Sequence, residues 1–207
     1  MNRDYYVNMF SPPPLGVTQF TGDIRYIEKL VREYEFQRNT CNSITVTDTI
    51  LDDPQFIDLR NFILNFVHRY TEKVCRSKQV IELKQSWANI TDTNEIHPTH
   101  MHPNSFISGV FYLMSDPEKG APITFKSDLH RSNFSVHMIQ KDPQAFYPSA
   151  AYAFGYPSVP GQLLLFSSTT SHMVPMNNSD SDRISLSFNT YPKLPFGSDE
   201  ALTRVRG

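Results

Sequence analysis

The sequence is poor in several residue types that define whole classes of protein. Only two of its 207 residues are cysteines and eight are glycines, and no apolar run is long enough to span a membrane. Cys41 and Cys75 are too few for a disulfide framework, so we expect reduced thiols. The first residues lack the apolar segment of a secretory signal peptide. These absences favour a cytoplasmic protein with no membrane partner.

An excess of positive charge is also missing, because the formal net charge is -2. Binding to a nucleic-acid backbone is therefore disfavoured. The chain does have enough hydrophobic residues to form a core: 39% of its residues are hydrophobic, with 15 phenylalanines and 10 tyrosines. A chain of this length suits one domain, so we expect residues 1–207 to form a single unit. The sequence leaves its oligomeric state open.

Residues 1–79 are expected to be a mainly helical support. After an irregular start at residues 1–17, apolar residues recur at helical spacing in residues 23–35. A second helix begins at Asp53 and Pro54, a favourable cap and first position, and its apolar stripe runs to about residue 75. We expect residues 38–51 to be a loop with a short strand near residues 44–46. His68 falls at a polar helical position and is expected at the surface.

Residues 80–195 are expected to hold the strands. Because the helices come first and the strands follow, the order favours an α+β domain that is mainly β. Residues 80–90 are expected to form a strand with Ile81, Leu83, Trp87 and Asn89 on one face. Trp87 is then expected in the core, while Asn89 is equally well a core hydrogen-bonding residue or a pocket residue.

The segment from residue 97 to residue 114 is central to the interpretation. It begins with three histidines in six positions and continues as an uncharged run rich in β-branched and aromatic residues, which is typical of a buried strand. Along a strand, His100 and His102 point the same way, and two adjacent imidazoles make half of a site for zinc, copper or iron. His97 precedes a proline and shares no clear strand phase with them, so we interpret it as a loop residue.

Two later segments can complete such a site. An apolar strand beginning near residue 161 ends in a small polar loop that carries His172. The alternation in residues 183–191 then places Arg183, Ser185 and Ser187 on one face and apolar residues on the other. A strand with a cation and hydroxyls on one face is typical of the lining of a polar pocket.

In this order and spacing, the segments resemble the iron(II)- and 2-oxoglutarate-dependent oxygenases. In that family, a His-x-Asp/Glu pair and a distal histidine hold the iron, and an arginine about ten positions later binds the far carboxylate of 2-oxoglutarate. Within it, the resemblance is to a prolyl-hydroxylase-like subgroup found in phage and marine bacterial genomes. The matching pieces are Trp87-Ala88-Asn89, His100-Met101-His102-Pro103, Ser108-Gly109-Val110-Phe111-Tyr112-Leu113, His172-Met173-Val174 and Arg183 to Asn189.

One departure from the family pattern concerns the metal ligands. His102 stands where the commonest pattern has a carboxylate, and no acidic residue lies between Glu95 and Asp116. Either His100, His102 and His172 supply three neutral ligands, or two histidines bind and water or the co-substrate fills the rest. Asp128 is a weaker candidate for a substitute carboxylate.

The resemblance implies a fold, a reaction and roles for particular residues. The fold is a double-stranded β-helix, or jelly roll, with the N-terminal helices packed outside one sheet. The chain is then an oxidoreductase that uses Fe(II), 2-oxoglutarate and dioxygen to hydroxylate a C–H bond, in the host cytoplasm if a phage encodes it. The implied metal ligands are His100, His102 and His172. The implied co-substrate residues are Arg183, Tyr112, Ser108, Ser185, Ser187 and Asn89.

Two rival functions remain: a non-catalytic metal-binding jelly roll, and a cupin-type metalloenzyme that does not use 2-oxoglutarate. Neither needs an arginine beside serines at the position of Arg183, so that residue favours the oxygenase. Because prolyl hydroxylases resemble the chain in motif order, a peptide or protein side chain is the first candidate substrate, with a small molecule or nucleobase as alternatives. Residues 129–160, long and rich in aromatic residues, are expected to set specificity.

Overall fold

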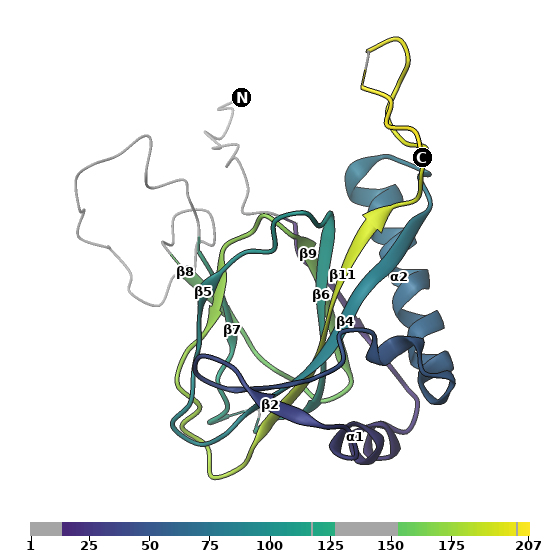
Figure 1. The fold of residues 1–207 in the computed structure, drawn as a ribbon. Helices are drawn as coiled ribbons and strands as arrows, with labels where there is room; N and C mark the ends of the chain where they lie inside the picture. The colour runs from purple at the N-terminus through teal and green to yellow at the C-terminus, as the bar shows by residue number, and fades with distance from the viewer. Residues whose placement is uncertain (1–13, 117, 127–152, 202) are drawn as a thin grey trace, which may run out of the picture.

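The computed structural model describes residues 14–116, 118–126, 153–201 and 203–207 (Figure 1). Its elements follow the chain in this order: β1 (Gly16–Gln19), α1 (Ile24–Arg32), β2 (Phe36–Arg38), β3 (Ser43–Thr45), η1 (Ile50–Asp52), η2 (Pro54–Phe56), α2 (Ile57–Cys75), β4 (Ile81–Thr91), β5 (His97–His100), β6 (Ile107–Met114), β7 (Ile123–Lys126), β8 (Ala153–Tyr156), β9 (Gln162–Ser167), β10 (His172–Val174) and β11 (Arg183–Pro192).

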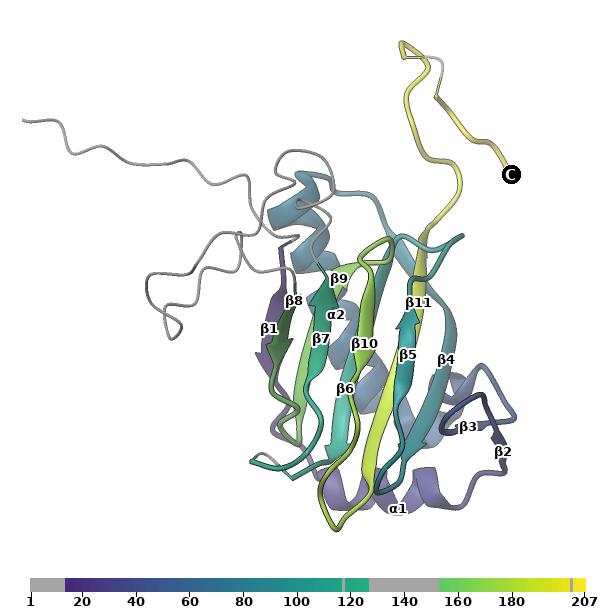
Figure 2. The same ribbon diagram turned by 90° about the vertical axis from the view of Figure 1, so that its left-hand side faces the viewer.

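The strands form two sheets that face each other (Figures 1 and 2). The larger has seven strands in the order β1-β9-β6-β11-β4-β3-β2, and the smaller has four in the order β5-β10-β7-β8. Every pairing between neighbouring strands is antiparallel. The protein is therefore mainly β, with two α-helices among the residues that the structure describes.

The larger hydrophobic core lies between the seven-stranded sheet and the helices, which cover its outer face (Figure 1). Ile63 and Val67 of α2 and Leu30 and Val31 of α1 are buried there in one cluster with large-sheet residues such as Leu186. Burying large apolar side chains stabilises the fold by about 1.5–3 kcal/mol each. The expectation that the N-terminal helices pack outside one sheet is confirmed.

A second, smaller core fills the space between the two sheets. Val110, Tyr112 and Leu164 from the large sheet meet Ile123 and Phe125 from the small one. Strand β6 thus buries both of its faces, because its alternate residues, including Phe111, belong to the larger core. This explains why residues 107–114 carry no charge, as a strand covered on both sides requires.

The predicted helices are present, with Asp23 capping α1 and Asp53 capping the short η2 turn that precedes α2. The short strand expected near residues 44–46 is present as β3, but the expectation for residues 1–79 was incomplete, since β1 and β2 also lie there. Strands β1 and β2 have four and three residues, and their pairing with β9 and β3 fixes them as strands. Such short segments carry too little periodicity to be recognised in a sequence.

The prediction that Ile81, Leu83, Trp87 and Asn89 share a face was wrong. The pairing of β4 with β11 shifts by one residue, with Lys84 as the extra residue on β4. Because side chains alternate, a one-residue bulge exchanges the two faces of everything beyond it. Ile81 and Leu83 therefore join the larger core, whereas Trp87 and Asn89 line a pocket between the sheets. Trp87 is accordingly not a core residue.

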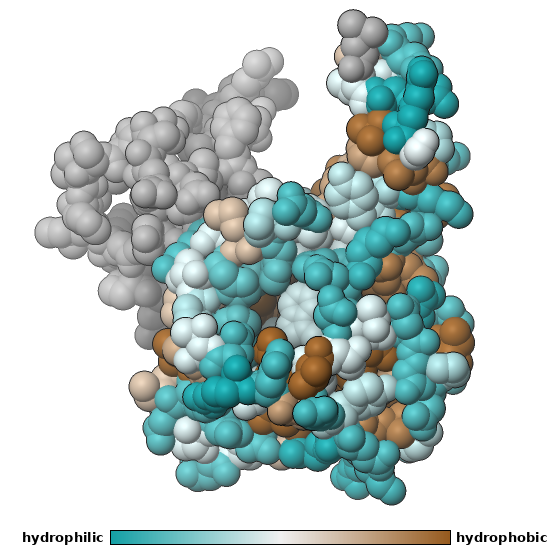
Figure 3. Space-filling model, viewed as in Figure 1, coloured by the Kyte–Doolittle hydropathy of each residue, from teal (hydrophilic) through white to brown (hydrophobic). Residues whose placement is uncertain are grey.

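The surface shown in Figure 3 is mainly hydrophilic, with separate hydrophobic residues rather than one continuous apolar area. His68 is exposed, as expected, and its Nε2 lies 3.2 Å from the Ile81 backbone nitrogen. Both cysteines are free. No helix in the described part of the chain is long and apolar enough to cross a membrane. Asp128 and most of the expected specificity segment at residues 129–160 lie outside the described residues.

Candidate metal centre

Two neighbouring strands of the small sheet bring His100 and His172 together. Strand β5 pairs with β10 so that His172 lies directly opposite His100, and the centroids of their rings are 4.3 Å apart. His172 is packed between Phe166 and the paired strand β7, which leaves it 5% exposed. It begins β10 rather than ending a loop, so its backbone is fixed by hydrogen bonds on both sides.

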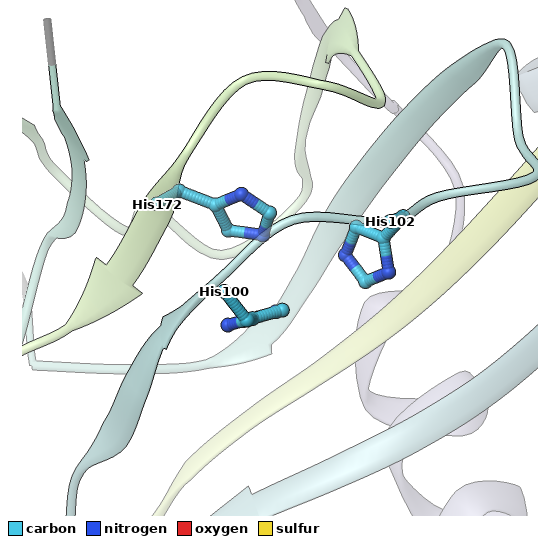
Figure 4. A group of neighbouring side chains, drawn as sticks. All are labelled: His100, His102 and His172. Carbon is cyan, nitrogen blue, oxygen red and sulfur yellow. The ribbon is translucent and has the colours of Figure 1, made fainter. Parts of the chain in front are cut away.

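His102 reaches the same point from a loop. Strand β5 ends at His100, so the expectation of one continuous strand carrying both residues was wrong. The His102 backbone N–H donates to the carbonyl of Ser168 at 2.9 Å, which holds the loop against the large sheet. Its ring lies 5.0 Å from His100 and 5.2 Å from His172 by centroids. The three rings point toward one shared space (Figure 4).

The three imidazoles have the spacing and the free atoms that a metal site needs. One ligand atom from each of His100, His102 and His172 lies within 4.8 Å of the other two. The Nδ1 atoms of His100 and His172 lie 2.8 Å from the carbonyls of Pro98 and Thr170. A carbonyl only accepts hydrogen bonds, so each Nδ1 carries the proton and each Nε2 is left with a lone pair. This is the arrangement common among metal-binding histidines.

Burial favours the neutral form of His102 and His172, as ligation requires. Removal from water, reinforced by His100, lowers the pKa of His172 to about 3. The same causes lower the pKa of His102 to about 4 and that of His97 to about 3. At neutral pH, His102 and His172 therefore offer lone pairs without first losing protons.

These depressed pKa values predict that the metal-free protein loses stability as the pH falls. Free histidines titrate near 6.5, so below that value the unfolded chain binds protons that the folded chain does not. Each of the three rings with a depressed pKa then lowers the free energy of unfolding by about 1.4 kcal/mol per pH unit. Denaturant unfolding between about pH 7 and about pH 5.5 measures this, and His172→Gln is expected to flatten the slope. An unchanged wild-type stability over that range would contradict the prediction.

Arg183 lies in the same pocket without a carboxylate partner. It is 3% exposed, its Nε donates to the carbonyl of Ala121 at 3.2 Å, and its Nη1 lies 3.4 Å from the Ser185 hydroxyl. Burial lowers the pKa of Arg183. Within the described residues it forms no ion pair. A buried guanidinium without a charged partner is costly, so this position is suited to binding an anion.

Tyr112 adds a second polar group beside Arg183. It is fully buried on β6, opposite Ser185 of β11, and the Arg183 guanidinium carbon lies 5.1 Å from the centre of its ring. Burial raises the pKa of the Tyr112 phenol to about 12. Its hydroxyl makes no well-formed hydrogen bond among the described residues. Tyr112, Ser185 and Arg183 thus leave hydrogen-bonding capacity unused at one place, as a carboxylate pocket would.

The other predicted pocket residues differ in whether their side chains are already hydrogen-bonded within the protein. The Asn89 side chain donates from Nδ2 to the Ser187 hydroxyl at 3.0 Å, while its own Oδ1 has no partner in the described part of the chain. Both residues line the pocket. Ser108 does not line the pocket. Its hydroxyl donates to Asn189 Oδ1 at 2.7 Å and lies 2.9 Å from the Ser168 hydroxyl. The Ser108 hydroxyl is therefore already hydrogen-bonded within the protein.

The sequence interpretation missed His97, which lies in β5 rather than in a loop and lines the pocket. Its ring stacks on that of His100, with centroids 4.3 Å apart and an interplanar angle of 14°. In the β5–β10 pairing, His97 opposes Val174 and His100 opposes His172, so β5 has an extra residue. Because of that bulge, His97 and His100 lie on one face although they are three positions apart. The alternation with a period of two that marks a regular strand does not indicate this.

Three imidazoles around one point, next to a buried guanidinium with no carboxylate partner among the described residues, form a site suited to a metal together with an anionic ligand. The sequence model described as "Putative 2OG-Fe(II) oxygenase" matches residues 85–189, about half of the chain. The chain therefore belongs to this family of oxygenases. None of the curated proteins compared with it matches.

Solved structures share the fold of this chain at low sequence identity. HygX from Streptomyces hygroscopicus, with nickel and 2-oxoglutarate bound, is 12% identical with a TM-score of 0.62, covering 88% of this chain and 84% of its own. The epimerase SnoN from nogalamycin biosynthesis is 14% identical, with a TM-score of 0.62 and coverages of 87% and 78%. A Pseudomonas putida prolyl-4-hydroxylase is 12% identical, with a TM-score of 0.59 and coverages of 87% and 94%.

The cofactors follow from the family. They are Fe(II), with 2-oxoglutarate and dioxygen as co-substrates, and neighbouring structures hold iron or nickel and 2-oxoglutarate. The residues present fit this set. Imidazole nitrogens suit Fe(II), and the unpaired Arg183 suits a dicarboxylate.

Proposed function

We propose that the chain hydroxylates a C–H bond of its substrate, with His100, His102 and His172 as the Fe(II) ligands. The observation that carries this proposal is Arg183, buried in the same pocket as the three imidazoles and without an ion-pair partner among the described residues. Bound iron supplies the activation of dioxygen, coupled to the oxidative decarboxylation of 2-oxoglutarate to succinate. Everything else in the reaction depends on how the chain's own side chains bind and orient the reactants.

Arg183 binds the distal carboxylate of 2-oxoglutarate, as a guanidinium can do with two parallel hydrogen bonds. The hydroxyls of Tyr112 and Ser185 complete that pocket, and Ser187 with Asn89 continues the polar wall along β11 and β4. Apolar residues such as Val110 and Phe166 line the rest and exclude water. The pocket thus orients one dicarboxylate with its other end toward the histidines.

Three histidine ligands explain the geometry of the metal site better than two histidines plus water do. The ligand atoms of all three histidines converge within 4.8 Å, and His102 is tied into place through its backbone. Compared with the usual two histidines and one carboxylate, this set leaves the metal site one unit more positive. That charge favours binding of the dianionic co-substrate.

The rival functions account for less of the pocket. A metal-binding module without catalysis has no use for a buried guanidinium beside two hydroxyls, and neither does a cupin-type enzyme without 2-oxoglutarate.

We assign residues 80–195 to a double-stranded β-helix core of one domain, with residues 1–79 as its support. We also assign the chain to the phage and marine bacterial subgroup, an assignment that the H-x-H-P pattern supports.

A peptide or protein side chain is the first candidate substrate. The motif order and the likeness in fold to a prolyl-4-hydroxylase support it. A small molecule is the second candidate, because one HygX structure with the same fold holds hygromycin B. The segment expected to select between them, residues 129–160, lies largely outside the described residues.

Calorimetry tests the proposed function directly. The protein loaded with Mn(II), which resembles Fe(II) in its ligand preferences, is expected to bind 2-oxoglutarate with about micromolar affinity, and the metal-free protein much more weakly. Succinate release from the Fe(II)-loaded protein in the presence of candidate peptides then tests turnover. If the loaded protein binds no 2-oxoglutarate, the non-catalytic or cupin-type alternative is the better account.

A further inference from the structure

His97 is a fourth imidazole in the pocket, with no role in the arrangement described so far. It lies against His100 and lines the same pocket, yet it is not among the three residues whose ligand atoms converge. A parallel stack with a 14° angle holds the flat face of His100 in place. That contact uses only the face of the His97 ring and leaves its edge, with both nitrogens, available.

The topology places His97 on the Arg183 side of the metal ligands. Strand β4 ends at Thr91, which pairs with Arg183, and β5 begins a few residues later at His97. Along β10, the partner of His97 is Val174, two residues beyond His172 and nearer the turn that leads to Arg183.

Backbone hydrogen bonds hold the two connecting loops together at this end, from Asn94 N–H to Asn177 O and from Asn177 N–H to Glu95 O. Arg183 and His172 both lie close enough to His97 to lower its pKa, which agrees with a position between them.

The ring nitrogens of His97 have no hydrogen-bond partner in the described part of the chain. In contrast, His100 and His172 each donate from Nδ1 to a backbone carbonyl. A neutral imidazole always carries one N–H donor, and the donor of the half-buried His97 has no partner within the described residues, so it is available to a ligand in the pocket that His97 lines. The ligand expected between the histidines and Arg183 is a dicarboxylate.

We infer that His97 is a co-substrate-binding residue, whose ring N–H donates a hydrogen bond to an oxygen of bound 2-oxoglutarate while its ring face positions His100. The inference rests on the proposed function, because it assigns a further contact in the same pocket. This role depends on the bulge in β5, because without the extra residue His97 would face away from the pocket.

The variant His97→Phe separates the two parts of this role, since phenylalanine retains a flat ring for stacking but has no donor. We expect the affinity of this variant for Mn(II) to stay within about twofold of wild type. Its affinity for 2-oxoglutarate is expected to fall by about tenfold or more, the loss typical of one hydrogen bond to a charged group. His97→Gln retains an N–H donor and should bind 2-oxoglutarate more tightly than His97→Phe.

The matched control is His68→Phe, the same change on α2 outside the pocket, which should alter neither affinity. Calorimetry with Mn(II) and then 2-oxoglutarate gives both values, and circular dichroism checks the fold. Wild-type affinity for 2-oxoglutarate in His97→Phe would overturn the inference, as would loss of Mn(II) binding with 2-oxoglutarate affinity of the loaded fraction unchanged. If the wild-type loaded protein itself binds no 2-oxoglutarate, the proposed function fails first.

Discussion

Replacing Arg183 with methionine is expected to remove 2-oxoglutarate binding without unfolding the protein. The guanidinium is 3% exposed and unpaired among the described residues, so it is the charge available to a bound carboxylate. Truncating one partner of a buried charge pair costs about 2–5 kcal/mol, which corresponds to a loss of affinity of about thirtyfold or more. Calorimetry of 2-oxoglutarate against the Mn(II)-loaded variant measures this loss.

The same variant makes an unusual prediction for stability. Without its ligand, the wild-type protein must bury an unpaired charge, and an apolar side chain of similar length removes that cost. We therefore expect metal-free Arg183→Met to unfold at a denaturant concentration equal to or higher than that of wild type. It should also lose the added stability that 2-oxoglutarate gives to the loaded protein.

Arg183→Lys serves as the matched control for charge. Lysine retains the positive charge but has no planar fork, so intermediate affinity for 2-oxoglutarate is expected. If Arg183→Met bound 2-oxoglutarate as tightly as wild type, the guanidinium would have no part in co-substrate binding. The argument against both rival functions would then be lost.

The second large effect is expected from His172→Ala. Removing a side chain that merely orients a ligand typically costs 10–100-fold in metal affinity, so loss of a ligand itself should cost about a hundredfold or more. Titration with Mn(II) followed by calorimetry measures it, and His68→Ala on α2 should bind metal as wild type does. Retained metal affinity and full 2-oxoglutarate turnover in His172→Ala would remove His172 from the site.

His102 decides between three protein ligands and two. If all three histidines bind, His102→Ala should lose metal affinity to a similar degree as His172→Ala. His102→Asp should recover much of that affinity, because it restores the carboxylate of the commoner family pattern. Wild-type affinity in His102→Ala would instead show that water or the co-substrate occupies that position.

Local regularity decided which parts of the fold the sequence could predict. Strand β11 alternates without interruption, so its division into Arg183, Ser185 and Ser187 on the pocket side and Ile184 and Leu186 on the core side was correct. The helix from residue 57 to residue 75 repeats its apolar stripe over five turns and was equally clear. Both elements keep one period throughout, so sequence spacing gives the direction of each side chain.

Bulges produced the errors at the site. The extra residue at Lys84 carried Trp87 from its expected place in the core to the pocket, where its ring centroid lies 5.8 Å from that of His102. A similar irregularity in β5 turned His97 inward beside His100. A bulge depends on the partner strand, which lies about a hundred residues away in the first case. Local sequence therefore contains no signal for it.

The sequence by itself determined which chemistry was available: histidines in two distant segments, an arginine at a fixed interval, and apolar runs to support them. Tertiary structure alone decided that His100 and His172 lie opposite each other, that His102 joins them from a loop, and that Arg183 is buried without a carboxylate partner among the described residues. The physical reason is that strand pairing brings together residues far apart in the chain. Register, rather than composition, then selects which side chains share a pocket.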